Sequence, residues 1–431
     1  MTSTDADAMN GAEAPDRLAG RPRLLFLCQT LPYPPDGGVH IRSFHLLRLL
    51  SRRYEVSAVC FYRRATRTTP AAVQAAADGL RRHVELASLD VYPIPQEYSR
   101  LRLLWDHGRS VLRRRAYTLF AYQSDAFRSR LLEILAEHRF DVIHIDSLDL
   151  ADYVKDLPHG VAVVCDHHNV ESALLERRAH QEPNMLKRRY FALQARLTRR
   201  EESRWCGNVD LNLTVSSQDR NLLQEHAPQA SVVVVPNGVD TTTFEPSYDG
   251  EDGIVFVGGY TWFPNKDGMR FFSERVLPRI REHRPNTSVR WVGRAPEAVV
   301  ETYRLRYGVE LTGYVDDIQP HVRGAACFVV PLLVGGGTRL KILDAWAMGK
   351  AVVSTSRGCE GLMARDGDNI LIRDSADAFA DAVLDVLSDA DLRVRLGRGG
   401  RTSAETEYDW RKIGDEMLSA YEALASRHES R

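Results

Sequence analysis

Three segments of this 431-residue chain combine residue types that can bind a charged ligand. The first is the loop QTLPYPPDGGVHIRSF, in which Gly37 and Gly38 lack a Cβ and precede a helical pattern. A ligand can approach such a pair closely, and the free N–H groups at a helix N-terminus favour an anion. The pair indicates contact with a phosphate or a sugar, although the same glycines would also serve a simple chain reversal.

The second segment, VVCDHHNVES, places polar side chains where an apolar strand pattern ends. Asp166, His167, His168 and Asn169 follow one another there. One of the histidines could hold a sugar hydroxyl or act on a proton. Adjacent side chains on an extended chain point apart, and no third ligand is evident, so we expect no bound metal.

The third segment is PLLVGGGTRLKILDAWAMGKAV. Glycines at 335–337 and Thr338 lead into a helical pattern whose first turn is expected to hold Arg339 and Lys341. A glycine loop, a helix N-terminus and two cations together suit a diphosphate. Asp344 lies one turn beyond Lys341, where a carboxylate can accept hydrogen bonds from a ribose diol. The spacing matches neither a Walker A loop nor GxGxxG, and the alternative is a tight turn before a solvated helix.

These segments belong to a chain that alternates short apolar strand patterns with helical ones. The alternation predicts parallel sheets with helices on both faces. The expected strands are 23–28, 55–62, 84–89, 141–146, 161–166, 211–216 and 231–236, then 253–260, 288–294, 309–314, 327–332 and 351–356.

The stretch NGVDTTTFEPSYDGED between the two series of strands is rich in Gly, Asp, Thr and Pro and marks a domain boundary. We expect a flexible tail at 1–20, a first domain at 21–245 and a second at 246–408. The last segment, 409–431, has a helical pattern that could pack back on the first domain. Ligands of open α/β sheets bind beyond the carboxyl ends of the strands, so the two domains are expected to share a cleft.

Composition excludes several classes of protein. The 57 Lys and Arg nearly balance the 58 Asp and Glu, which argues against a nucleic-acid binder. Six cysteines without a CxxC motif indicate buried, reduced thiols rather than disulfides or a zinc site. The first twenty residues lack the order of a signal peptide, and no apolar run reaches the roughly 20 residues that a bilayer requires. A cytoplasmic protein is expected.

Two basic stretches are hidden in this neutral total. Residues 97–130 hold eight arginines and three acidic residues, interleaved with Leu, Trp, Tyr and Phe, and residues 186–204 hold seven basic and two acidic residues. Basic amphipathic helices of this kind can lie on an anionic membrane, at the inner face in this case. The alternative is a set of solvated helix faces that pair with acidic loops.

Three longer segments together resemble a known family. VVPNGVDTTTF (234–244), GYVDDIQPHVRGAACFVVPL (313–332) and GGGTRLKILDAWAMGKAVVSTSRGCEG (335–361) are similar to glycosyltransferase family 4. The resemblance is to the polysaccharide-associated group 1 sugar transferases and extends from about residue 23 to residue 425. It implies a GT-B fold, in which two Rossmann-like domains face each other, and a retaining transfer from a nucleotide-sugar donor.

The resemblance also implies site residues. Tyr314 and Val315 would flank the base, Asp344 would hold the ribose, and His168, with His167 as the alternative register, would contact the donor sugar or the diphosphate. The donor-binding residues are then Gly37, Gly38, Lys266, Tyr314, Val315, Gly336, Gly337, Thr338, Arg339, Lys341 and Asp344, and the catalytic residue is His168.

The chain departs from the family pattern at two places. The family usually carries two Glu separated by seven residues, and here these positions hold Gly336 and Asp344. The family's Arg after the first strand of the second domain corresponds to Gly259, and Lys266 corresponds to the following family Lys in one register. Arg339 and Lys341 could supply the missing positive charge.

The expected reaction needs no cofactor, because fixed cations and helix N–H groups can stabilise a departing nucleoside diphosphate without a metal. The acceptor would be a glycan, a lipid-linked sugar or a small molecule, and no side chain is an evident nucleophile for a double displacement. A nucleotide-sugar epimerase or a phosphorylase of the same architecture is one alternative. A degenerate transferase acting as a partner subunit, suggested by Gly259 and Gly336, is another.

Overall fold

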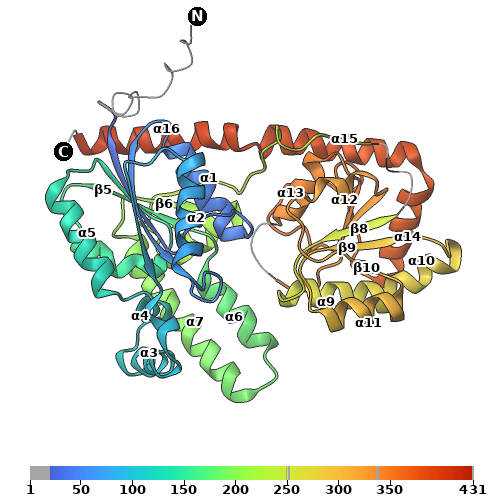
Figure 1. Ribbon diagram of the computed structural model, residues 1–431, viewed down its shortest axis with the longest axis horizontal. Coiled ribbons are helices and arrows are strands. Elements are labelled where there is room, and N and C mark those ends of the chain that lie inside the picture. The colour runs from blue at the N-terminus through green and yellow to red at the C-terminus, as the bar shows by residue number, and fades with distance from the viewer. Residues whose placement is uncertain (1–19, 249, 251–252, 336–338, 430–431) are drawn as a thin grey trace, which may run out of the picture.

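The computed structural model describes residues 20–248, 250, 253–335 and 339–429. The chain forms two α/β domains that lie side by side, with one long helical segment along both of them (Figure 1). The predicted tail at 1–20 lies outside the described residues, apart from Gly20.

The first domain is built on a sheet of seven parallel strands in the order β3-β2-β1-β4-β5-β6-β7. The central strands β1, β4 and β5 are buried on both faces, which explains the uninterrupted apolar run of β1 from Leu24 to Cys28. The strand order reverses between β1 and β4, and ligands of such sheets bind at this crevice. The strands are β1 Arg23–Cys28, β2 Glu55–Tyr62, β3 Ser88–Pro93, β4 Val142–Ile145, β5 Ala162–His167, β6 Leu211–Thr214 and β7 Val232–Val234.

The second domain repeats this topology with six parallel strands in the order β10-β9-β8-β11-β12-β13. Its order reverses between β8 and β11, so the equivalent crevice lies at the ends of these strands. The strands are β8 Ile254–Val257, β9 Val289–Val292, β10 Glu310–Leu311, β11 Cys327–Val330, β12 Val352–Ser354 and β13 Leu371–Ile372.

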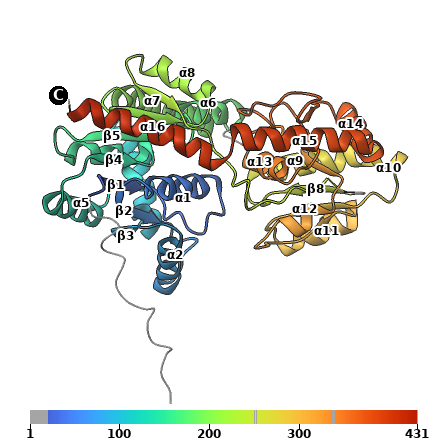
Figure 2. The same ribbon diagram turned by 90° about the horizontal axis from the view of Figure 1, so that it is seen from above.

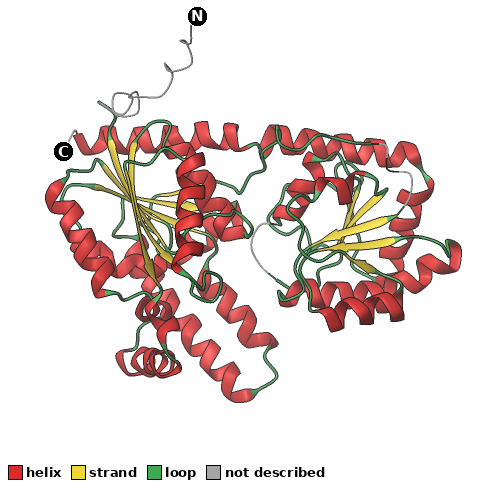
Figure 3. Ribbon diagram, in the orientation of Figure 1, coloured by secondary structure: helices red, strands yellow, loops and turns green. Residues whose placement is uncertain are grey.

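Helices cover both faces of each sheet (Figure 3). Those of the first domain are α1 Gly38–Leu50, α2 Pro70–His83, η1 Pro95–Tyr98, α3 Arg100–Arg113, α4 Tyr117–Ala121, α5 Asp125–Glu137, η2 Leu148–Asp156, α6 Glu171–Gln181, α7 Met185–Cys206 and α8 Ser217–His226. Those that follow are α9 Phe263–Phe271, the π-helix η3 Phe272–Val276, α10 Leu277–His283, α11 Glu297–Tyr307, α12 Gln319–Arg323, α13 Leu340–Ala347, α14 Ala376–Ser388, α15 Ala390–Glu407 and α16 Trp410–Glu429.

The C-terminal helix α16 crosses back over the first domain (Figure 2). Trp410, Met417 and Tyr421 are buried in the hydrophobic core that β1, β2 and α1 form. The preceding helix α15 packs on the second domain instead, since Leu396 and Ala404 belong to that domain's core. The turn between α15 and α16 therefore marks the point where the chain returns from one domain to the other.

The structure confirms the two-sheet architecture and most of the predicted strands, but the strand predicted at 84–89 is wrong. Val84 ends α2, because its N–H bonds to the carbonyl of Leu80 at 2.9 Å, and β3 begins four residues later. Every residue of β3 is only half-buried, so the edge strand lacks the apolar run that marks the central ones. The six cysteines are buried and free, as predicted.

Candidate functional site between the two sheets

A buried ion pair lies at the carboxyl edge of the first sheet. Arg42 of α1 donates to both carboxylate oxygens of Asp166 in β5, at 2.7 Å from Nε and 2.6 Å from Nη2, and neither side chain is exposed. The Arg42 guanidinium also donates to the carbonyl of Val235 at 2.8 Å. Burial would raise the pKa of Asp166, but the charge and hydrogen bonds of Arg42 outweigh burial and lower the pKa to about 2. Asp166 is thus an ionised anchor that fixes α1 against β5.

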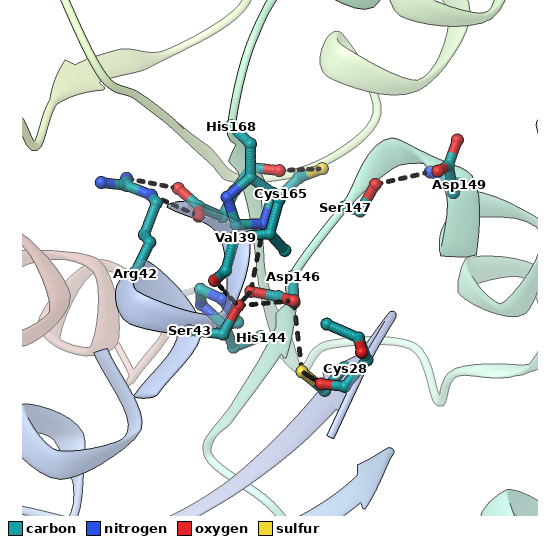
Figure 4. A network of polar contacts seen from close by, with 12 residues as sticks. Cys28, Val39, Arg42, Ser43, His144, Asp146, Ser147, Asp149, Cys165 and His168 are labelled. Carbon is teal, nitrogen blue, oxygen red and sulfur yellow. Dashed lines mark hydrogen bonds and ion pairs between the residues drawn. The ribbon is translucent and has the colours of Figure 1, made fainter. Parts of the chain in front are cut away.

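A second carboxylate, Asp146, follows β4 at the same edge and faces His168 (Figure 4). The Ser43 hydroxyl lies 2.8 Å from Asp146 Oδ1, and the Cys28 thiol lies 3.2 Å from Oδ2. His168 Nε2 is 3.5 Å from Oδ1. Burial lowers the pKa of His168, yet the charge and hydrogen bond of Asp146 outweigh burial, so the pKa lies above its ordinary value. Asp146 therefore favours the protonated form of the His168 imidazole at the carboxyl edge of the first sheet.

The two adjacent histidines point to different neighbours. His167 is buried and its Nε2 lies 3.0 Å from the side-chain oxygen of Asn212 in β6, whereas His168 faces Asp146. Burial lowers the pKa of His167. Of the two registers that the sequence left open, only His168 shares a cluster with Asp146.

Within the part of the chain that the structure describes, one group could offer ligands to a metal: Asp146, Asp166 and His168, whose ligand atoms lie within 4.8 Å of one another. Arg42 already occupies both oxygens of Asp166, and Ser43 and Cys28 point at Asp146. A divalent cation would have to displace a buried guanidinium from its bidentate pair. The donor set therefore fits an arginine-neutralised anion network and does not fit a metal ion.

The glycine loop of the first domain approaches the second domain directly. A Cβ added to Gly38 would lie 3.8 Å from Cδ1 of Leu340, the first residue of α13. A Cβ on Gly37 would lie 3.5 Å from His40 Nδ1. The N-terminus of α1 is thus placed opposite the helix that carries Lys341 and Asp344.

Lys341, in the first turn of α13, is the centre of the second domain's polar cluster. Its Nζ donates to the side-chain oxygen of Asn265 at 2.7 Å and lies 4.2 Å from the ring centroid of Phe256. Burial and the charge of Arg339 lower its pKa well below the ordinary value. A bound anion would favour the protonated form of the Lys341 amine and would therefore raise this pKa again.

Arg339 does not lie in the first turn of α13, as the sequence predicted, but occupies the N-cap position before it. Its side chain is buried, Nη2 donates to the carbonyl of Arg357 at 3.3 Å, and burial lowers its pKa to about 10. The Trp262 ring lies 5.8 Å from the guanidinium carbon of Arg339 and 5.9 Å from Lys341 Nζ. Trp262 therefore joins the two cations into one cluster.

Asp344 is partly exposed on α13, one turn after Lys341. Burial raises its pKa to about 7, although the Lys341 charge opposes the rise. The carboxyl group is therefore close to half-ionised at neutral pH, which makes any hydrogen bond that it accepts sensitive to pH.

The remaining predicted donor residues are more scattered. Tyr314 is 54% exposed and lies 4.8 Å from the guanidinium carbon of Arg294, and Val315 packs against the second core. Lys266 is exposed on α9 and lies 5.3 Å from the Tyr260 ring. The carbonyl of Gly259 accepts a hydrogen bond from Asn265 at 2.9 Å. Three further predicted residues lie outside the described residues: Gly336, Gly337 and Thr338.

Sequence reasoning missed Arg42, Asp146, Asn265 and Trp262. Asp146 follows its strand just as Asp166 ends the neighbouring one, and carboxyl ends of adjacent parallel strands meet at one edge, so this signal was available. Arg42 and Asn265 gave no such signal, because their roles depend on partners more than 70 residues away in the chain.

Two parallel-sheet domains with polar clusters on facing edges define a GT-B protein. Solved structures share this fold over 94% of this chain. Sucrose-phosphate synthase from Thermosynechococcus elongatus has a TM-score of 0.67 at 16% identity, and Anabaena Alr3699/HepE in complex with UDP and glucose has 0.64 at 13%, each covered over its whole length.

Family models identify the chain within this class. "Glycosyltransferase Family 4" matches residues 36–243 and "Glycosyl transferases group 1" matches residues 251–389. The chain belongs to this family of group 1 glycosyltransferases.

Two curated relatives are similar over part of their length. A phosphatidyl-myo-inositol mannosyltransferase of Mycolicibacterium smegmatis is 29% identical over 47% of this chain and 54% of its own length. The lipopolysaccharide core biosynthesis glycosyltransferase LpsE of Rhizobium meliloti is 35% identical over 28% of this chain and 34% of its own length. The chain thus spans about half, or less, of the curated relatives that it matches.

Proposed function

We propose that this protein transfers a sugar, with retention of configuration, from a nucleoside-diphosphate donor held on the second domain. The observation that carries the proposal is the Arg339–Lys341–Trp262 cluster, which lies at the start of α13 and faces the glycine loop of the first domain. Two cations beside a helix N-terminus and an opposing glycine pair suit a diphosphate.

The donor's other parts follow from this placement. Asp344, one turn along α13, would accept the ribose diol, and the exposed Tyr314 with Val315 would flank the base. Gly37 and Gly38 would meet the diphosphate and the sugar from the opposite side. Lys266 is a weaker donor contact in this arrangement, because its amine lies over Tyr260 and not beside Trp262.

Charge stabilisation accounts for the mechanism. When the bond between the sugar and the diphosphate breaks, negative charge grows on the leaving phosphate, where Arg339 and Lys341 would stabilise it without a metal ion. His168, whose pKa Asp146 raises, would donate to a sugar hydroxyl or a phosphate oxygen in its protonated form. The acceptor oxygen would attack from the face that the phosphate leaves, and its proton would pass to the departing phosphate.

Binding of free nucleotides tests the donor site. A ligand that binds only the folded state stabilises it by a free energy that grows with the logarithm of [L]/Kd, so UDP, GDP or dTDP should raise the melting temperature of the protein in EDTA. We expect Lys341→Met to abolish this rise, while Lys412→Met on the exposed start of α16 keeps it. Unchanged nucleotide binding in Lys341→Met would show that the donor is bound elsewhere.

We also propose that the first domain contacts an anionic membrane through α3 and the N-terminal turn of α7. No helix that the structure describes is long and apolar enough to cross a bilayer. However, α3 exposes Leu101 by 78%, Trp105 by 64% and Leu112 by 79%, and α7 begins with the exposed Met185 and Leu186. Apolar side chains flanked by cations are typical of a helix that lies in the membrane interface.

The two helices form one surface at the lower end of the first domain in Figure 1. Gln194 of α7 donates to the Ser110 hydroxyl of α3 at 2.8 Å, and His107 bonds the Tyr190 hydroxyl. We call the exposed residues of α3 and 185–189 the α3–α7 surface.

Only part of the basic surplus at 97–130 is free to meet a membrane. Arg102 and Arg115 pair with carboxylates within the domain, as do Arg128 and Arg130. Among the described residues, the exposed cations of the α3–α7 surface without an ion pair are Arg100, Arg113, Lys187, Arg188 and Arg189, and Arg114 directly follows α3. Each could contribute about 1 kcal/mol of attraction near an anionic leaflet.

Vesicle flotation tests the membrane contact. The protein should float with vesicles that contain phosphatidylglycerol, and Leu112→Ser should weaken the binding, because it removes an apolar side chain from the interface. Leu305→Ser on α11, an equally exposed leucine of the second domain, is the matched control. Absence of flotation in the wild-type protein would remove the membrane proposal and leave the donor site unaffected.

A further inference from the structure

A cavity of about 590 Å³ lies between the two domains, beside the donor cluster. One wall is formed by Asn169 and helix α6, and the other by Trp262 and Phe263 with the loop from Leu333 to Gly335. The volume falls within the roughly 300–1,000 Å³ that ligand sites in proteins occupy. The donor assignments leave this cavity without an occupant.

Its neighbours place the cavity next to the proposed diphosphate site. Trp262 lines the cavity and also lies beside Arg339 and Lys341, which are assigned to the diphosphate. Asn169, the residue after His168, and Glu171 also line the cavity. A group bound here would contact Trp262 and would therefore lie beside the residues assigned to the diphosphate.

The charged lining favours an anion. Arg177 and Arg178 of α6 and Arg357 of the second domain face the cavity. Arg177 lies 3.5 Å from one oxygen of Glu360, and Arg357 lies 2.7 Å from the other, so two guanidinium groups share one carboxylate. Arg178 is exposed and stacks over Phe191 at 4.2 Å, which leaves its N–H groups available. This lining can accept a phosphate without breaking a buried pair.

The lining also contains large apolar side chains, several of them exposed. Trp262 is 44% exposed, Phe263 61% and Leu333 41%, and Leu174 and Leu175 of α6 oppose them. Exposed large apolar side chains gathered in a cavity indicate a ligand with an apolar part. A purely polar acceptor, such as a free sugar phosphate, would leave these side chains in contact with water.

The cavity also has a direct connection to the α3–α7 surface. Helix α6 spans 11 residues, about 16 Å at 1.5 Å per residue, and it leads from the His168 segment to the turn before Met185. Figure 1 shows α6 and α7 as a hairpin that extends from the domain interface towards the end where α3 lies. An apolar chain leaving the cavity along α6 would therefore reach the surface proposed to contact the membrane.

We propose that this cavity binds the head of a lipid-linked phosphate acceptor, with the phosphate between Arg177 and Arg357 and the first apolar groups over Trp262 and Phe263. This inference rests on the proposed transferase function and selects one class among the glycan, lipid-linked and small-molecule acceptors. The lipid chain follows α6 to the α3–α7 surface, so the acceptor is used without leaving the membrane.

Binding of citronellyl phosphate, a short prenyl phosphate, to the full-length protein in the presence of UDP tests the inference. Calorimetry should show that it binds at least tenfold more tightly than citronellol or inorganic phosphate. Arg177→Gln and Arg357→Gln should each weaken binding at least tenfold. Arg199→Gln, whose guanidinium pairs with Glu176 outside the cavity, should bind within twofold of the wild-type protein.

Three other outcomes would contradict the acceptor site or the donor site. Equal binding of inorganic phosphate and citronellyl phosphate would mean an anion site with no selection for lipid. Equal binding by wild type and both arginine variants would place the acceptor elsewhere. If UDP binds and citronellyl phosphate does not, the acceptor inference fails alone, whereas failure of UDP to bind would refute the proposed donor site.

Discussion

The Arg42–Asp166 pair is expected to dominate the stability of the first domain's site, and Arg42→Met is the sharpest test. Methionine keeps much of the side-chain length but removes the charge and leaves Asp166 as an unpaired carboxylate with no exposure to solvent. Breaking a buried pair from one side costs about 3–5 kcal/mol. We expect this loss in urea unfolding at neutral pH.

The pH dependence of the unfolding free energy distinguishes the loss of this ion pair from a general packing defect. In the wild-type protein the pKa of Asp166 is lowered from 3.8 to about 2, which corresponds to about 2 kcal/mol of stability at neutral pH. Because the folded pKa lies below the unfolded one, this contribution is present above about pH 5 and is lost as the pH falls towards 2.

In Arg42→Met the pKa shift of Asp166 on folding changes sign, because burial without a charged partner raises the pKa of this carboxyl. The difference in unfolding free energy between the wild-type protein and the variant should therefore shrink as the pH falls from 7.5 to about 5, because the Asp166 carboxyl of the variant can then be protonated. Adding Asp166→Asn should recover part of the loss, and the double-mutant cycle should show a coupling of at least about 1 kcal/mol. A cost below about 1 kcal/mol for Arg42→Met, with no dependence on pH, would refute this reasoning.

Three further predictions concern other titrating or buried groups. Affinity for UDP should rise about tenfold from pH 6 to pH 8 if only ionised Asp344 accepts the ribose diol, since its pKa is about 7, and titration calorimetry of Asp344→Asn should show no such slope. Nucleotide binding should raise the lowered pKa of Lys341, because a diphosphate favours the charged amine. Calorimetry in HEPES and in Tris should show a buffer-dependent enthalpy that Lys341→Met lacks. Tyr421→Phe should cost about 1–3 kcal/mol in urea unfolding, because it leaves Nδ1 of the buried His144, now 2.6 Å from the Tyr421 hydroxyl, without its partner.

The sequence predicts those parts of the fold that bury apolar runs. Strands β1 and β2 have the predicted bounds because long, doubly buried strands show uninterrupted hydrophobicity. The strand β10 is shorter than predicted, and β13 was not predicted at all. Each has only two residues, and so short a strand leaves little periodic signal in the sequence.

The site is predictable where it depends on local chemistry. Lys341 and His168 were found because they follow glycine-rich or strand-end segments, and the structure gives each a partner from another element, Asn265 and Asp146. These partners depend on tertiary packing, which spacing along one chain does not encode. The departure of Arg339 from the first helical turn has the same origin, because its side chain is held in the interior by the carbonyl of Arg357.

The most direct test of the account is a transfer assay in EDTA with UDP-, GDP- and dTDP-sugars and vesicle-bound lipid phosphates as acceptors. The account predicts that one donor class releases its nucleoside diphosphate while the sugar appears on the acceptor with retained configuration, and that Lys341→Met stops both. Isomer exchange of the donor without nucleotide release would indicate an epimerase. A folded protein that neither binds nor consumes any of these donors would contradict the central claim.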